Sequence, residues 1–199
     1  MDGVVATLAS GNEHKLDELR AALPQWELSL LRGVELPPET GSTYYENART
    51  KARLGAAAAE RGTWMLGEDS GIEVAALGGR PGIASARWAE DGVARVLEEL
   101  DGVEDRRARY VCELVAVSPE GDELRGTGVL EGRIAYERRG SEGFGYDPIF
   151  VPDGETRTVA ELGNAWKSEH SHRARAAQAL LAARAPSALR PTPRSNDDR

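Results

Sequence analysis

The chain lacks the features that mark several large classes of protein. It has a single cysteine among its 199 residues, Cys112, so no disulfide can form within the chain, and this fits a reducing compartment. No apolar run approaches the length of a membrane span, and the first residues have neither the basic nor the apolar segment of a secretion signal. We therefore expect no membrane association and a cytoplasmic location.

A surplus of positive charge is also missing, since the formal net charge is -8. General nucleic-acid binders need a broad basic face to displace counterions, so we expect no nucleic-acid partner. Lysine is scarce as well, because 22 of the 25 basic residues are arginine and only Lys15, Lys51 and Lys167 are lysine. An ammonium group binds phosphate as a compact point charge, so each lysine is a candidate phosphate ligand, although chance composition explains the same count.

The length fits one domain, and 40% apolar with 29% charged residues is ordinary for a globular protein. No internal repeat is apparent. We expect a single domain over residues 1-185. Three prolines stand among small and charged residues in 186-199, which predicts a disordered C-terminal tail.

The central motif is residues 67–74, GEDSGIEV, which follow the short apolar run 64–66. The pattern predicts a buried strand that ends where a glycine-permitted turn begins. Glu68 and Asp69 repel each other there, and keeping both ionised is costly unless a cation or a protonation role compensates. Taken alone, a polar turn capped by Asp69 and Ser70 is the commoner explanation.

The first residues predict a strand, a glycine turn and a helix. Residues 4–9 form an apolar run, and leucines over 16–23 fall on one stripe of a helix. Such a junction exposes backbone N–H groups to an anion, but the Walker A spacing is absent. Capping of the helix by Ser10 or Asn12 is the commoner explanation of this loop.

A second helix is predicted from Thr43 to about residue 61. Thr43 and Glu46 have the spacing of a capping box. Asn47 and Lys51 would then share one face near its start, and Glu39 would lie in the loop just before it. A solvated charge is the plain alternative for Lys51.

The middle of the chain contains mostly predicted helices, strands and loops to which we assign no chemistry. Residues 76–82 form a glycine-rich loop, and 93–100 a short amphipathic helix without evident chemistry. Apolar runs at 110–117 and 124–134, joined by a turn, predict a long hairpin. Beyond it, residues 143–150 predict either a bent loop that holds Phe144 where a base can stack or an aromatic core plug, and the octapeptide does not separate the two.

The last ordered part is predicted to be helical. Thr158 and Glu161 again have capping-box spacing, and a final helix is expected to run from the stretch 168–173 to about residue 185. The histidines in this region lack a cysteine partner and H-E-x-x-H spacing, so they are poor candidates for metal ligands. His172 beside Arg173 fits better as a hydrogen-bond donor.

Five motifs in order give the sequence a family resemblance. They are SGNEHK, ETGSTYYENARTKA, EDSGIEV with LGGRPGIASARW, GFGYDPIF, and AEL followed by KSEHSHR. From Val4 to about Leu181 the chain resembles the inosine triphosphate pyrophosphatase family, also called Ham1-like or non-canonical purine NTP pyrophosphatases. The resemblance implies an α/β fold with a long central mixed sheet, helices on both sides and two lobes flanking a nucleotide cleft. It also implies a homodimer, a Mg²⁺ cofactor, and hydrolysis of ITP, dITP and XTP to the monophosphate and pyrophosphate.

Carried over by position, the resemblance makes Asp69 the catalytic acid–base residue and a metal ligand, with Glu39 and Glu68 as further metal-site carboxylates. Many bacterial members have Asp where this chain has Glu68, and the longer side chain leaves open whether it binds Mg²⁺ directly or through water. Residues 89–106 and the tail match poorly and are assigned no role. The implied substrate-binding residues are Ser10, Gly11, Asn12, Glu13, His14, Lys15, Lys51, Ser70, Phe144, Gly145, Tyr146, Asp147, Lys167, His172 and Arg173.

The residues fit this chemistry independently. A nucleoside triphosphate carries about four negative charges, which must be neutralised before water can attack the α-phosphorus. Asp69 would orient or deprotonate that water, and donors on His172 and Arg173 would favour a 6-oxo base over adenine. Two alternatives remain open: a Maf-like pyrophosphatase that prefers pyrimidine or modified nucleotides, and a non-catalytic nucleotide-binding regulator.

Overall fold

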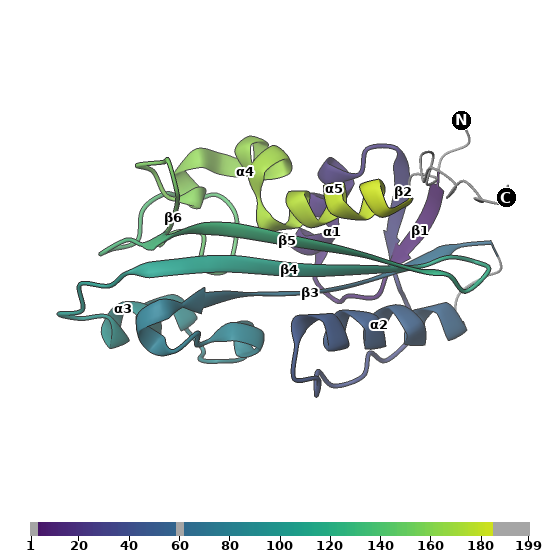
Figure 1. Cartoon of the computed structure of the whole chain (residues 1–199), viewed down its shortest axis with the longest axis horizontal. Helices are drawn as coiled ribbons and strands as arrows, with labels where there is room; N and C mark the ends of the chain where they lie inside the picture. Colours follow the sequence, from purple (N-terminus) through teal and green to yellow (C-terminus); the bar gives the residue numbers. More distant parts are fainter. Residues whose placement is uncertain (1–3, 59–61, 185–199) are drawn as a thin grey trace, which may run out of the picture.

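A six-stranded mixed sheet, with helices on both faces, forms the centre of the molecule (Figure 1). The computed structural model describes residues 4–58 and 62–184. The strands are β1 (Val4–Leu8), β2 (Trp26–Leu30), β3 (Trp64–Val74), β4 (Arg107–Val117), β5 (Glu123–Ile134) and β6 (Phe150–Pro152), in the order β2-β1-β3-β4-β5-β6. β1 pairs in parallel with β2 and β3, and the other pairs are antiparallel. The expected α/β fold with a long mixed sheet is confirmed.

The helices divide between the two faces of the sheet. Figure 1 shows α1, α4 and α5 on one side of the long strands, and α2 and α3 on the other side of that view. α2 packs on β3 and β4, whereas α5 packs on β4 and β5 and contacts α1 and α4. The helices are α1 (Glu13–Ala22), α2 (Tyr44–Ala58), α3 (Gly92–Glu99), α4 (Val159–His170) and α5 (His172–Arg184), with short 3₁₀ turns at Ala75–Leu77 and Gly82–Ala84.

The prediction of a turn at residues 67–74 is wrong, because β3 continues through them. β4 pairs with β3 from Met65↔Val117 to Val74↔Ala108, and this long antiparallel ladder keeps the glycines in extended backbone. Two strands, β2 and β6, were not predicted. The final helix, α5, begins at His172, inside the stretch 168–173 from which it was expected, and residues 168–170 belong to α4.

The predicted helix starts are borne out. Thr158 and Glu161 form a complete capping box at the start of α4. The Thr43 hydroxyl accepts the Glu46 N–H at 3.1 Å, but the Glu46 carboxylate accepts from the Ser42 backbone instead of from Thr43. The predicted helix end near residue 61 and the predicted tail 186-199 lie outside the described residues.

Two glycines let helices approach the sheet closely. A Cβ on Gly67 would lie 2.0 Å from the Ala48 carbonyl oxygen and 2.5 Å from the Ala52 nitrogen. On the other face, a Cβ on Gly128 would lie 1.9 Å from the His172 carbonyl oxygen. Such distances are impossible for real side chains, so glycine at these positions lets the middle of α2 and the first turn of α5 lie against the strands.

β1 covers only the first part of β3, and this leaves an open edge. Their pairing ends at Leu8↔Leu66, and in the described part of the chain the next partner on that edge is the isolated bridge Glu73↔Pro81. The chain leaves β1 here and enters α1. The carboxyl end of a parallel strand, a helix N-terminus and an unpaired strand edge therefore meet in one place, which is where open α/β sheets bind ligands.

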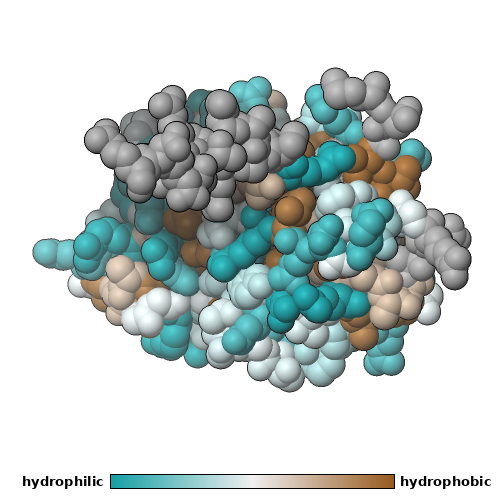
Figure 2. All heavy atoms as spheres, turned by 45° about the vertical axis from the view of Figure 1, so that its right-hand side comes forward, coloured by the Kyte–Doolittle hydropathy of each residue, from teal (hydrophilic) through white to brown (hydrophobic). Residues whose placement is uncertain are grey.

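One face of the molecule carries its apolar residues in separate positions (Figure 2). Figure 2 shows a face on which hydrophilic and neutral residues predominate and hydrophobic residues appear in separate patches. Within residues 4–58 and 62–184, no helix has the length and apolar character needed to cross a membrane.

Candidate active site

Successive side chains of β3 point to opposite faces of the sheet, and Asp69 points toward α2. Its Oδ2 accepts a hydrogen bond from Asn47 Nδ2 at 2.8 Å, and Lys51 Nζ lies 3.6 Å from Oδ1. Asp69 is only 3% exposed. Burial raises its pKa above the ordinary value, although Lys51 and Asn47 act in the opposite direction. A buried carboxylate with a raised pKa beside a cation is typical of a catalytic base.

Lys51 connects Asp69 to Glu39. Its ammonium group donates to Glu39 Oε1 and, at 3.1 Å, to the backbone carbonyl of Glu68. Burial alone would raise the pKa of Glu39, but the hydrogen bond and charge of Lys51, together with Lys15 and Arg87, lower it. Arg87 donates to the other Glu39 oxygen at 2.7 Å, which holds that carboxylate from both sides. Sequence analysis did not identify Arg87, because nothing in its spacing links it to Glu39.

Glu68 lies on the opposite face from Asp69 and is fully buried. Lys15 Nζ lies 2.6 Å from its Oε2, and Arg173 Nε donates to its Oε1 at 3.0 Å. Burial would raise the pKa of Glu68, but these two cations hold it well below the ordinary value. The carboxylate is therefore ionised and joins α1 to α5 beneath the open edge. Cys112 Sγ lies 3.6 Å from Oε1.

A second group of charges surrounds Lys167, which is 2% exposed. Its ammonium lies 2.6 Å from Asp147 Oδ2 and 2.5 Å from Glu18 Oε1. The other oxygen of Glu18 lies 2.5 Å from Arg173 Nη1, so one carboxylate holds both cations. Glu18 was not predicted as a site residue. Its position three residues after Lys15 places it on the same helix face, which is a signal that could have identified it.

The loop before α1 is a capped helix start. Asn12 Oδ1 accepts the N–H of His14 at 2.9 Å and of Lys15 at 3.4 Å, and Ser10 Oγ accepts the N–H of Asn12. The capping explanation is therefore confirmed, and these N–H groups already have an acceptor. Glu13 points outward and pairs with Arg32 at 2.6 Å.

A cavity of about 150 Å³ lies between β3, the Phe144 loop and α5. Phe144 lies at its rim, where its ring stacks on His14 with centroids 5.3 Å apart and lies 4.7 Å from Lys167 Nζ. Of the two phenylalanines, Phe150 is the fully buried one. The cavity is lined by Asn12, Lys15, Ser70, Gly71, Ile72, Ser85, Ala86, Tyr110, Phe144, Gly145, Tyr146, Asp147, Lys167, His172 and Arg173.

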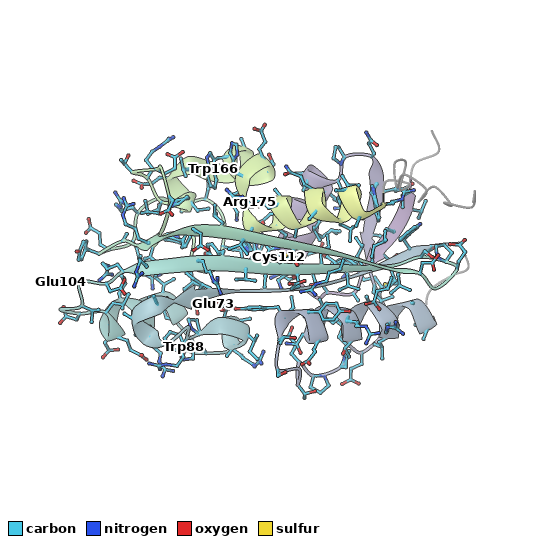
Figure 3. All side chains as sticks on the ribbon, in the orientation of Figure 1. Glu73, Trp88, Glu104, Cys112, Trp166 and Arg175 are labelled. Carbon is cyan, nitrogen blue, oxygen red and sulfur yellow. The ribbon has the colours of Figure 1, made fainter. Side chains whose placement is uncertain are left out.

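A larger hollow of about 620 Å³ lies elsewhere and contains none of the predicted residues. Figure 3 shows the separation: Glu104, which lines this hollow, lies at one end of the sheet, whereas Cys112, next to Glu68, lies nearer the middle. Size alone therefore does not identify the site. The convergence of buried acids and cations favours the smaller cavity.

The predicted residues thus fall into two groups on either side of β3. Glu39, Lys51 and Asp69 lie on the α2 face, and Lys15, Glu68, Lys167 and Arg173 lie on the α5 face. The open edge of β3 joins them. Across the ranges that the structure describes, no three His, Cys, Asp or Glu side chains are arranged to hold a metal ion by themselves.

Comparison with known proteins gives a consistent result. A family model with the description Ham1 family matches residues 6–183. A dITP/XTP pyrophosphatase of Deinococcus deserti is 44% identical over 190 residues, covering 92% of this chain and 90% of that protein. The Ham1 protein of Staphylococcus aureus superposes with a TM-score of 0.78 at 34% identity, covering 89% of this chain and 96% of that one. A nucleoside-triphosphatase, dITP/XTP pyrophosphatase, of Mycobacterium abscessus gives a TM-score of 0.68 at 40% identity, covering 92% and 98%.

Proposed function

Because this chain belongs to the Ham1 family, we propose that it hydrolyses the non-canonical purine nucleotides ITP, dITP and XTP to the monophosphate and pyrophosphate. The names and high identity of its relatives support this activity. The observation that carries the proposal is the position of Asp69. It is buried, lies 3.6 Å from Lys51, and stands at the open edge of β3, beyond which the cavity with Lys15 and Lys167 begins.

The substrate is proposed to lie across this edge. The purine would enter the cavity beside Phe144 and His172, where a ring can stack and hydrogen bond. The phosphates would run along the edge between Lys15 and Lys51, whose ammonium groups have N–H donors left for phosphate oxygens. In this arrangement the two faces of β3 have different tasks. The purine base lies in the cavity on the α5 face, and the attacked phosphorus lies beside Asp69 at the edge of the strand.

Glu39 and Asp69 fit a Mg²⁺ ion that arrives with the nucleotide. Both are oxygen donors on one face, both approach Lys51, and Mg²⁺ is commonly bound through one or two carboxylates plus substrate phosphates and waters. The ion would neutralise phosphate charge and polarise phosphoryl oxygens. We propose that Glu68 does not bind this ion directly, because its carboxylate lies on the other face with Lys15 and Arg173.

Asp69 is proposed to accept a proton from the attacking water. The water oxygen bonds to the α-phosphorus while the bond from that phosphorus to the α,β-bridging oxygen breaks, and pyrophosphate leaves with that oxygen. Asn47 fixes the carboxylate through its 2.8 Å hydrogen bond, so that one oxygen stays directed away from the amide. The neighbouring cations offset charge that develops on the leaving group.

The choice of base is proposed to depend on donors in the cavity. Burial, followed by the charge of Arg173, lowers the pKa of His172 well below its ordinary value, so the imidazole is neutral and can act as donor or acceptor. With the imidazole N–H directed at the base, a 6-oxo purine gains a hydrogen bond, whereas a 6-amino purine leaves two donors facing each other.

Product analysis tests the function directly. The purified chain is incubated with Mg²⁺ and, separately, with ITP, dITP, XTP, ATP, GTP, CTP and UTP. We expect pyrophosphate, not phosphate, from the first three, and slow release from ATP, CTP and UTP. GTP also carries a 6-oxo group, so its rate reports on recognition of the 2-position of the purine. A preference for pyrimidine nucleotides would support the Maf-like alternative, and no release from any nucleotide would support a binding regulator.

A homodimer and a cytoplasmic location are further proposals, and sedimentation at working concentration tests the first.

A further inference from the structure

Tyr110 is a buried residue of β4 to which the proposed function assigns no task. It is 6% exposed and reaches the floor of the cavity, where its ring and its hydroxyl group contact two different substrate-binding candidates. The ring stacks on His172, and the hydroxyl group bonds to Asp147. Both contacts come from one side chain held by the central sheet, so they share one rigid support.

The hydroxyl group determines how the Asp147 carboxylate is turned. Asp147 Oδ2 accepts from Lys167 Nζ at 2.6 Å and from the Phe144 backbone N–H at 2.8 Å. Its Oδ1 accepts from Tyr110 at 3.1 Å, which is the one side-chain donor that this oxygen has among the described residues. Without the hydroxyl group, Oδ1 is a buried acceptor without a partner, and the carboxylate is free to rotate away from Lys167 and the Phe144 loop.

The ring determines the plane of the His172 imidazole. The two rings are 4.5 Å apart and inclined by only 9°, and Phe150 packs on Tyr110 from the core at 4.5 Å. Nδ1 of His172 is buried and has no hydrogen-bond partner in the described part of the chain. Since no hydrogen bond to that nitrogen orients the imidazole, stacking is the contact that does so.

We propose that Tyr110 is a positioning residue that sets substrate affinity through Asp147 and base preference through His172. The inference rests on the proposed function, because it assigns both partners to the nucleotide. Two substitutions separate the two roles of Tyr110. A phenylalanine keeps the ring and loses the hydroxyl group, whereas a leucine loses both.

The test compares Tyr110→Phe and Tyr110→Leu with the wild type, using calorimetric binding of IMP and AMP in EDTA and hydrolysis of ITP and ATP with Mg²⁺. For Tyr110→Phe we expect the Kd for IMP to rise about three- to tenfold, with kcat and the IMP:AMP preference within about twofold of wild type. For Tyr110→Leu we expect the preference to fall about tenfold or more. Tyr45→Phe is the matched control, because that hydroxyl also donates to a carboxylate, Glu123 at 2.7 Å, away from the cavity.

NMR of the His172 ring gives a readout that needs no activity. Stacking on an aromatic ring shifts the imidazole protons upfield, so the shift is expected to remain in Tyr110→Phe and to disappear in Tyr110→Leu. Unchanged IMP affinity in Tyr110→Phe, an equal change in Tyr45→Phe, or a retained preference and ring shift in Tyr110→Leu would each overturn the proposal. A wild type that does not distinguish IMP from AMP would instead remove the proposed base recognition, and the ring shift would still decide whether Tyr110 positions His172.

Discussion

Glu68 and Asp69 are neighbours in β3, yet their carboxylates lie on opposite faces of the sheet and contact different helices. Asp69 meets Asn47 and Lys51 of α2, and Glu68 meets Lys15 of α1 and Arg173 of α5. Two adjacent acids therefore avoid each other, because the strand separates them and each has its own cations. Glu68 is held by two close cations, whereas Asp69, with one amide donor and a cation 3.6 Å away, is the carboxylate that we propose as the base.

The first prediction concerns Glu68→Gln. This change leaves Lys15 and Arg173 facing a neutral group, so we expect the free energy of unfolding at pH 7 to fall by about 3–5 kcal/mol. Urea unfolding of the metal-free protein measures it. The pH dependence has a definite sign: the folded-state pKa of Glu68 is depressed, so its stabilisation is present above the unfolded pKa and is lost as pH falls. The difference between variant and wild type should therefore shrink below about pH 4.5.

Glu113→Gln is the matched control for Glu68. It also removes a buried strand carboxylate, one that is paired with Arg125 at 2.8 Å but lies away from Lys15 and Arg173. Nucleotide affinity should fall in the Glu68 variant and stay unchanged in the control. Equal affinity in both variants would show that Glu68 does not organise the cations of the cleft.

The second prediction concerns Asp69→Asn, which keeps the size of the side chain and removes its basicity. We expect kcat for ITP to fall by a factor of about 10² to 10⁴, because general-base catalysis contributes on that scale. Binding of ITP in EDTA should stay within about threefold of wild type, since Lys15 and Lys167 are untouched. Single-turnover kinetics and calorimetry measure the two effects. Near-normal turnover would remove Asp69 from the role of base.

Much of the framework could be predicted from local patterns. The capping box of Thr158 and Glu161 and the apolar runs of the hairpin act through neighbours in the sequence, and these elements form where expected. β3 could not be delimited in this way, because glycine and serine in a run favour a turn until β4 pairs with them. β2 had a signal in the sequence, because apolar and polar residues alternate in WELSL. In the structure the apolar residues of this strand are buried and the polar ones exposed.

The site was predictable in composition but not in arrangement. The acids and lysines could be identified by residue type and by family resemblance. Which face of the sheet Glu68 and Asp69 point to, however, depends on β3 being extended through both residues. Arg87 escaped detection because its role depends on contact with Glu39, which lies far away in the sequence. The helix face that Glu18 shares with Lys15 could have marked it as a candidate, but its partners Lys167 and Arg173 are also distant in the sequence. Side-chain partners across such distances come from packing, which no local pattern encodes.

The third prediction refines the role of Arg173 in base preference. Its guanidinium already donates to Glu68, Glu18 and Ser70, so alanine would remove a buried network as well as a donor. Arg173→Lys keeps the charge and loses the planar fork. We expect the ITP:ATP ratio of kcat/KM to fall about tenfold while kcat for ITP changes less. An unchanged ratio would move recognition of the base to backbone groups near Phe144.

The last prediction depends on a break inside α4. Gly163 has φ 86° and ψ 175°, so the helix restarts at Asn164, whose N–H donates to Glu142 at 2.9 Å. The restarted segment carries Lys167, and Glu142 belongs to the loop that carries Phe144. A cap at this point therefore fixes two substrate-binding candidates relative to each other.

Glu142→Ala and Glu161→Ala form a matched pair that tests this cap. Glu161 also accepts a backbone N–H at a helix start, from Thr158 at 2.7 Å, but it caps the first segment of α4 instead of the segment with Lys167. Both variants should lower the Tm by about 2–5 °C. Only Glu142→Ala should raise the KM for ITP severalfold, and Glu142→Gln should restore it, because an amide oxygen accepts the same hydrogen bond. A KM that rises equally in both alanine variants would mean that α4 responds as one body and that the break at Gly163 has no part in holding Lys167.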